Sequence, residues 1–125
     1  MPITTAGLTH MVQATIGEAV TSFANANAHI GVGNGTTAFS AAHTDLQGAS
    51  KARKAMDATY PQRSGLQLTF RSSFASGDAN FAWEEWGIFN AAAAGTMLNR
   101  VVANNGTKAS GATWVFTVTL TPSLA

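Results

Sequence analysis

The sequence contains no cysteine among its 125 residues. This absence excludes a disulfide framework, a thiolate metal site and a cysteine nucleophile, and it leaves the redox compartment undetermined. No apolar run approaches the roughly 20 residues needed to cross a membrane. The N-terminal residues MPITTAGLTHM also lack the charged start and apolar stretch of a secretory signal. We therefore expect no membrane partner.

Charge is scarce as well. Charged residues make up 10% of the chain, against a usual share of about 25%. The formal net charge is +1, and apart from a short cluster at Lys51, Arg53 and Lys54 the basic residues are scattered. This pattern argues against nucleic-acid binding. Because charge keeps free monomers soluble, so little of it favours a homo-oligomer or a protein covered by partner proteins.

The length suits one domain over residues 1–125. Helical spacing of apolar residues predicts an amphipathic helix over about residues 6–20, with Thr4 or Thr5 as its N-cap. Gly17 marks a possible earlier end, since glycine is unfavourable inside a helix and common just past its end. The apolar positions are Leu8, Met11, Val12, Ile16, Ala19 and Val20.

The rest of the chain, over residues 51–121, is β-rich. Alternation predicts strands over residues 66–74, 80–90, 97–103 and 113–121, with a short apolar strand at 28–32. Residues 51–60 read equally well as strand or helix. The turn Ser76–Asp78 suggests that strands 66–74 and 80–90 pair with each other. The expected fold is mainly β, an antiparallel β-sandwich of about five to six strands with one N-terminal helix and a long loop.

The long loop covers residues 33–50 and consists mostly of Gly, Thr, Ser and Ala. A loop of this length in a small domain is usually functional. It has little apolar area to offset the entropy of ordering, so we expect a neighbouring chain to order it. The candidate assembly contacts are Gly33, Thr36, Phe39, His43 and Leu46.

The stretch Asn80–Asn90 is the most apolar part of the chain and the expected central strand. Alternation places Phe81, Trp83, Glu85, Gly87 and Phe89 on one face. An unpaired carboxylate on such a face would cost several kcal/mol. We therefore predict an ion pair between Glu85 and a basic residue, Arg100 first and Arg53 second.

Aromatic residues on alternating strand positions predict a buried core. The expected members are Phe70, Phe81, Trp83, Phe89, Trp114 and Phe116. Exposed aromatic rings also stack on sugars, so Tyr60, Trp83, Trp86 and Trp114 leave a carbohydrate-binding module as a weaker alternative.

No residue pattern predicts catalysis, a metal site or a cofactor. Glu84 and Glu85 are neighbours on a strand and point to opposite faces, so they cannot flank a glycosidic bond. The histidines lack metal-ligand spacing, and Ser40, His43 and Asp45 come from one loop without a nucleophile elbow. The glycines of GVGNG suggest a phosphate cradle only superficially, since no Lys-Ser/Thr follows. We expect a protein that is not an enzyme and has no cofactor.

Several motifs, taken in order, resemble a pattern found in virion proteins of tailed bacteriophages. They are HIGVGNGTT from His29, HTDLQG from His43, SKARKAM from Ser50, EEWGIF from Glu84 and GTMLNRVV from Gly95. The resemblance covers most of the chain from Ile30 onward. It gives Glu85 the acid position and Arg100 the basic position of the pattern, whereas Trp86 stands where the pattern more often has a small or apolar residue.

The resemblance implies a non-enzymatic structural component of the virion, assembled in the cytoplasm of the bacterial host. A capsid decoration or minor capsid protein is the favoured role, because the chain is one domain without a repetitive shaft. Its partners would be the major capsid protein lattice or tail proteins of the same phage. The alternative is a minor tail, baseplate or tail-fibre attachment protein.

Overall fold

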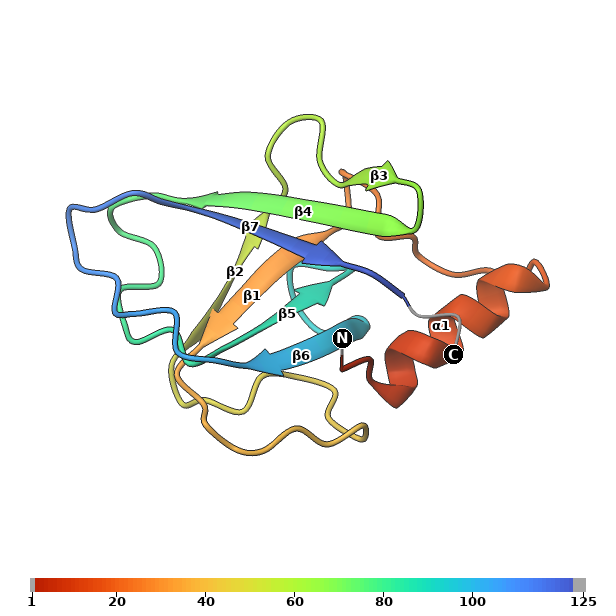
Figure 1. Ribbon diagram of the computed structural model, residues 1–125, viewed down its shortest axis with the longest axis horizontal. Coiled ribbons are helices and arrows are strands. Elements are labelled where there is room, and N and C mark those ends of the chain that lie inside the picture. The colour runs from red at the N-terminus through yellow and green to blue at the C-terminus, as the bar shows by residue number, and fades with distance from the viewer. Residues whose placement is uncertain (1, 123–125) are drawn as a thin grey trace.

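Two antiparallel β-sheets pack face to face, and one helix lies beside them (Figure 1). This computed structural model describes residues 2–122. Its elements are α1 (Thr5–Thr15), β1 (His29–Gly33), β2 (Lys51–Ala55), β3 (Gln62–Ser64), β4 (Gln67–Phe74), β5 (Glu85–Phe89), β6 (Met97–Val102) and β7 (Trp114–Leu120). The strand orders are β2-β1-β5-β6 and β3-β4-β7. The predicted mainly β sandwich with one N-terminal helix and a long loop is confirmed.

The described residues contain seven strands, one or two more than expected. The additional strand is β3, which has three exposed polar residues and is too short to show alternation. Residues 51–55 form a strand, whereas residues 56–60 form neither strand nor helix. The strand interpretation of residues 51–60 is therefore correct for their first half.

The main core lies between the two sheets. β7 alternates as predicted, with Val118 and Leu120 buried inward and Val115 and Thr117 exposed. Trp86 faces this core, half-buried, with its ring 6.0 Å from that of Phe116. The buried members from the other strands include Ile30, Val32, Phe70, Phe74, Ile88 and Leu98.

A second, smaller apolar cluster lies on the opposite face of the four-stranded sheet, where Leu46, Phe89 and Met97 pack together. The prediction that Phe81, Trp83, Glu85 and Phe89 share one face of a strand is therefore wrong for Phe81 and Trp83. Trp83 belongs to the main core and Phe89 to the smaller cluster. The reason is that the strand begins at Glu85, so the alternation does not extend back to Trp83.

The predicted pairing of residues 66–74 with 80–90 is also wrong. β4 pairs with β3 and β7, whereas β5 pairs with β1 and β6. The backbone of residues 81–83 bonds to residues 105–108 between the two strands. For example, Trp83 N donates to Gly106 O at 2.8 Å. The segment after Asp78 therefore leads from one sheet to the other.

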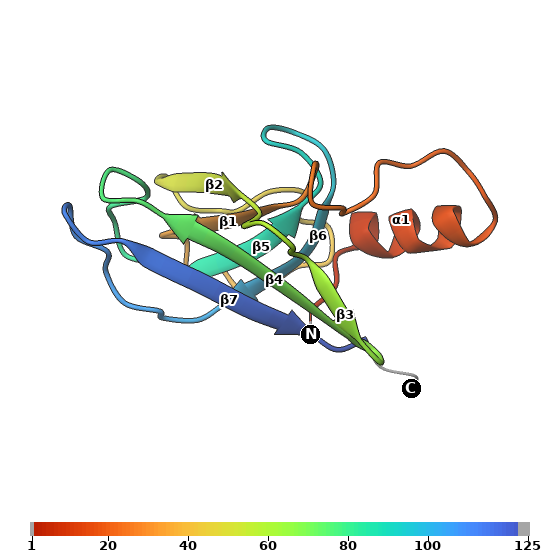
Figure 2. The same cartoon turned by 90° about the horizontal axis from the view of Figure 1, so that it is seen from above.

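The helix is shorter than the predicted range of 6–20. Thr4 is its N-cap, accepting a hydrogen bond from Gly7 N, and Gly17 follows its end with a φ of 79°, a conformation that glycine adopts without strain. Gly7 is the buried residue of α1 and lies against the backbone of Leu98 in β6. The rest of the helix stands beside the sheets (Figure 2), and it is too short to cross a membrane.

Candidate functional site

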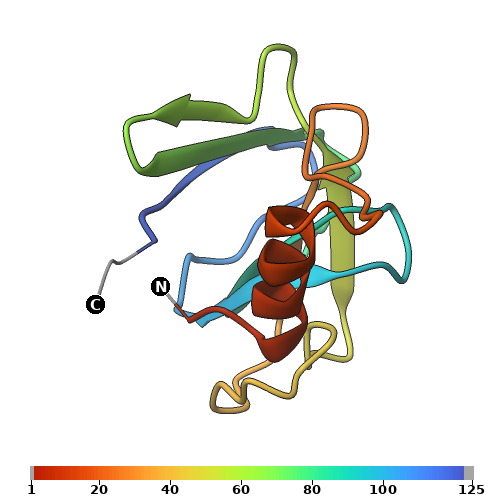
Figure 3. The same cartoon turned by 90° about the vertical axis from the view of Figure 1, so that its right-hand side faces the viewer.

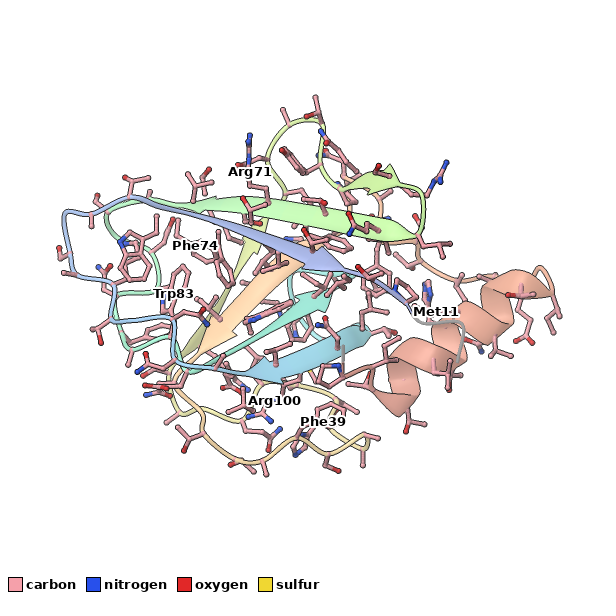
Figure 4. All side chains as sticks on the ribbon, in the orientation of Figure 1. Met11, Phe39, Arg71, Phe74, Trp83 and Arg100 are labelled. Carbon is pink, nitrogen blue, oxygen red and sulfur yellow. The ribbon has the colours of Figure 1, made fainter. Side chains whose placement is uncertain are left out.

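The predicted ion pair between Glu85 and Arg100 is present beneath the long loop. Arg100 Nε lies 2.7 Å from Glu85 Oε1, and neither side chain is exposed. Arg100 Nη1 donates a further hydrogen bond of 2.9 Å to Thr37 O. Figure 4 shows Arg100 directed from β6 toward the loop that carries Phe39. The pair therefore connects two neighbouring strands with the loop above them.

The Glu85 carboxylate also connects the two ends of the loop between β1 and β2, here called loop 34–50. Its oxygens accept hydrogen bonds from Gly35 N at 3.0 Å, Gln47 N at 2.8 Å and Gly48 N at 2.7 Å. A Cβ atom on Gly35 would lie 2.6 Å from Glu85 Oε2, and one on Gly33 would overlap the same oxygen. Gly33 and Gly35 of GVGNG thus allow a carboxylate of the same chain to approach the backbone, whereas Gly31 lies against the Phe89 ring.

Arg53, the second predicted partner of Glu85, does not contact it. Its guanidinium lies 3.6 Å from the centroid of the Phe89 ring and donates to Ala91 O and Ala94 O, each at 2.9 Å. Its nearest carboxylate is Asp45, at 3.6 Å. The reason is position in the sheet: β1 separates β2 from β5, so Arg53 starts about 10 Å from the strand of Glu85.

The five predicted assembly contacts divide into two groups. Gly33 is the last residue of β1 and is buried, and Leu46 is 3% exposed in the smaller apolar cluster. Neither can contact a partner directly, and the expectation that a neighbouring chain orders the whole loop is wrong for both of its ends. Thr36 is exposed, and Phe39 and His43 are half-buried with their rings 6.4 Å apart. Residues 36–44, the outer part of the loop, remain available.

A groove of about 480 Å³ separates α1 from the outer part of the loop. A hollow of about 320 Å³ shares three of its lining residues, His10, Gln13 and Thr96. No Asp, Glu, Lys or Arg lines either space, so the groove offers hydroxyl, amide and imidazole groups. One of the imidazoles is engaged, since His10 Nε2 lies 2.8 Å from Thr21 O.

Three apolar side chains project into solvent, two from successive turns of α1 and the third, Ile16, from its C-cap. Leu8 is 55% exposed, Val12 58% and Ile16 71%. We call these three residues the α1 stripe. The sequence pattern missed their exposure, because a helix that buries its apolar face and one that presents it have the same spacing. Met11 packs against the main core instead.

The predicted aromatic core is confirmed for Phe70, Trp83 and Phe89, whereas Phe81, Trp114 and Phe116 are half-buried. A cavity of about 330 Å³ lies beside them at the edge of β7, lined by Trp83, Asn105, Thr113, Trp114, Val115 and Phe116.

Three of the rings considered for sugar stacking are engaged within the chain. The ring of Trp83 contacts that of Trp114 edge to face at 5.0 Å, and Trp83 is 1% exposed. Arg71 lies 4.4 Å over the ring of Tyr60. These contacts weigh against the carbohydrate-binding alternative.

The catalytic arrangement considered for the loop does not form. His43 Nδ1 lies 3.2 Å from the backbone N–H of Ser40 and accepts from it. The Asp45 carboxylate bonds to Lys51 Nζ at 2.7 Å and to Leu46 N at 2.8 Å. Burial acts to raise the pKa of Asp45, but these bonds and the charges of Lys51 and Arg53 outweigh it and hold the pKa below its ordinary value. Within residues 2–122, no group of three or more His, Asp or Glu is placed to hold a metal ion.

No protein-family model matches this chain, and no curated protein or solved structure matches it either.

Proposed function

We propose that this protein is a non-enzymatic structural component of a tailed-bacteriophage particle, a capsid decoration or minor capsid protein that binds the assembled shell. The observation that carries the proposal is the α1 stripe. Three large aliphatic side chains stand in water on one side of a helix whose only buried residue is Gly7. Each is more than half exposed, so covering it with a partner would contribute roughly 1 to 2 kcal/mol of hydrophobic free energy.

An exposed apolar helix face of this kind fits a groove on a partner protein, with anchors one turn apart. Leu8, Val12 and Ile16 have that spacing of four residues. The outer part of loop 34–50 lies next to α1 (Figure 3). Residues 41–44 of this loop and residues of α1 line the same groove. The stripe does not line the groove, but it lies on the same helix, so the proposed contact with the shell combines the α1 stripe with the outer loop.

The resemblance to virion proteins supports the choice of a phage particle. Its motifs form one physical unit, because Glu85 of EEWGIF pairs with Arg100 of GTMLNRVV. The same carboxylate holds the loop that runs from HIGVGNGTT to HTDLQG. The motifs thus supply, in order along the chain, the two ends of loop 34–50, the carboxylate of Glu85 that binds both ends, and Arg100, which pairs with this carboxylate.

Cosedimentation tests the proposal and its alternative, a minor tail, baseplate or tail-fibre attachment protein. The purified protein is mixed with isolated heads or isolated tails of the phage that encodes it. Binding to heads supports the decoration role, whereas binding to tails alone supports the alternative. A Leu8→Ser/Val12→Ser variant should lose binding with little change in Tm. Leu66→Ser is the matched control, because Leu66 is 61% exposed outside α1. No binding to either structure would overturn the proposal.

A further inference from the structure

The strand β7 ends its sheet, and its outer edge has no strand beside it among residues 2–122 (Figure 2). Among the helices and strands of residues 2–122, β4 is the only one that β7 contacts. Within the same range, none of residues 114–120 makes a backbone hydrogen bond outside the β4–β7 ladder. An open edge of this kind presents a row of free N–H and C=O groups to any strand that can pair with it.

The edge at β6 is covered by the chain itself. Thr4 N donates to Leu98 O at 3.1 Å, and Arg100 N donates to Pro2 O at 3.2 Å. Ile3 forms an isolated bridge with Asn99 between these two bonds. Residues 2–4 therefore occupy the positions at which another strand would pair.

The edges at β2 and β3 are protected in other ways. β2 carries Lys51, Arg53 and Lys54, and charge on an edge strand discourages pairing. β3 is only three residues long. β7 has none of these protections: it is seven residues long, contains no proline or charge, and keeps its register with β4 without a bulge. Of the four sheet edges, β7 alone is open, uncharged and long.

We propose that β7 pairs antiparallel with β7 of a second copy of this chain, across a two-fold axis at Thr117. The two three-stranded sheets then join into one six-stranded sheet. A two-fold axis makes each contact occur twice. In this register Thr117 faces Thr117, Phe116 faces Val118, Val115 faces Thr119, and Trp114 faces Leu120.

This register is favoured because the strand complements itself. Inward residues oppose inward residues and outward residues oppose outward ones, so the apolar inner face of one copy continues into that of the other. Thr–Thr pairs and aromatic–β-branched pairs are favourable across strands, and no like charges meet. Trp114 and Phe116 are half-buried beside the edge cavity, and a second copy would cover them.

The inference does not rest on the particle assignment. β7 and α1 do not contact each other, so the self-pairing edge and the α1 stripe are separate surfaces. Loss of shell binding in the α1 variant and loss of self-association in a β7 variant are therefore distinguishable outcomes.

The absence of native cysteine permits a register-specific cross-linking test. Residues opposite each other in an antiparallel pair have Cα atoms about 4.5 to 5.5 Å apart, within the range that a disulfide spans. Thr117→Cys should therefore give a disulfide-linked dimer under mild oxidation. Val115→Cys should not cross-link to itself, because the two copies of residue 115 would be about 13 Å apart. A mixture of Val115→Cys and Thr119→Cys should cross-link.

Charge substitutions test the same contact without a covalent bond. Thr117→Lys and Thr117→Asp should each weaken the dimer about tenfold, because like charges meet at the axis, and mixing the two variants should restore association. Ser64→Lys, on the exposed strand β3 of the same sheet, should leave it unchanged. Thermal melting checks that each variant folds. A wild-type protein that stays monomeric at every concentration in analytical ultracentrifugation would overturn the proposal, as would a dimer that Thr117→Cys fails to cross-link.

Discussion

Arg100 Nε donates to Glu85 Oε1 at 2.7 Å in a place where neither side chain reaches solvent. Three backbone N–H groups of loop 34–50 share the same carboxylate. Burying two charges costs several kcal/mol, so a pair of this kind adds little net stability compared with apolar residues of the same size. We expect its effect to be specificity: loop 34–50 has Phe39 and Leu46 as its only large apolar side chains, and three of its amides are held in place by one acceptor.

Replacing Glu85 with Ala should destabilise the protein by about 3 to 5 kcal/mol, because Arg100 would be left buried without a counter-charge. Three loop amides would lose their acceptor as well. Chemical denaturation measures the change in the free energy of unfolding. Glu84→Ala is the control, since the half-buried Glu84 side chain makes no ion pair in the structure. A loss below about 0.5 kcal/mol for Glu85→Ala would contradict the importance assigned to the buried pair.

Gly35→Ala should destabilise the loop by about 1 to 3 kcal/mol, because its Cβ would lie 2.6 Å from Glu85 Oε2. Gly77→Ala should have little effect, since no atom lies within 4 Å of the position of its Cβ. Both glycines have φ values accessible to alanine, so the comparison isolates the steric term. A Cβ on Gly35 would also lie 2.5 Å from Gly48 N, so equal stability of the two variants would mean that both the carboxylate and this backbone segment can move away at no cost.

Hydrogen exchange should divide loop 34–50 into two parts. The amides of Gly35, Gln47 and Gly48 should exchange slowly in the isolated protein, because each donates to Glu85. The amides of Ala38, Phe39 and Ala41, which donate no hydrogen bond among residues 2–122, should exchange fast when isolated and slowly when bound to the shell. Uniformly fast exchange across the loop would show that the Glu85 contacts do not persist in solution.

Asp45 should contribute to stability in a pH-dependent way. The folded-state pKa of Asp45 lies below its ordinary value: burial acts to raise it, but the bonds and charges of Lys51, Leu46 N and Arg53 prevail. The stabilisation is therefore present above the unfolded pKa of about 4 and lost as pH falls through the folded pKa. The carboxylate is 41% exposed, so solvent screening keeps the effect small.

The measurement compares wild type with Asp45→Asn. The difference in unfolding free energy should be larger at about pH 7 than at about pH 2, because protonation of the Asp45 carboxylate at low pH removes its charge. A difference that grows on acidification would show that the sign assigned to the pKa shift is wrong.

Local patterns were enough to predict several features. The alternation of Trp114 to Leu120 placed β7 and both of its faces, since a strand turns successive side chains to opposite sides. Thr4 was recognisable as a helix cap and Gly17 as a possible end. The burial cost of a carboxylate among apolar residues was enough to predict a basic partner for Glu85, and the structure has the first of the two candidates, Arg100.

Other features were decided only by the tertiary structure. Which strands pair depends on contacts far apart in the sequence, and β4 and β5 have a short connection although they lie in different sheets. Arg53 could reach Glu85 only if β1 did not lie between them. Whether Leu8 and Val12 face the core depends on where the helix docks, which Gly7 decides by its close approach to Leu98. Strand period and helix spacing are properties of a few neighbouring residues. Strand order, open edges and exposed helix faces exist only once the distant segments have packed.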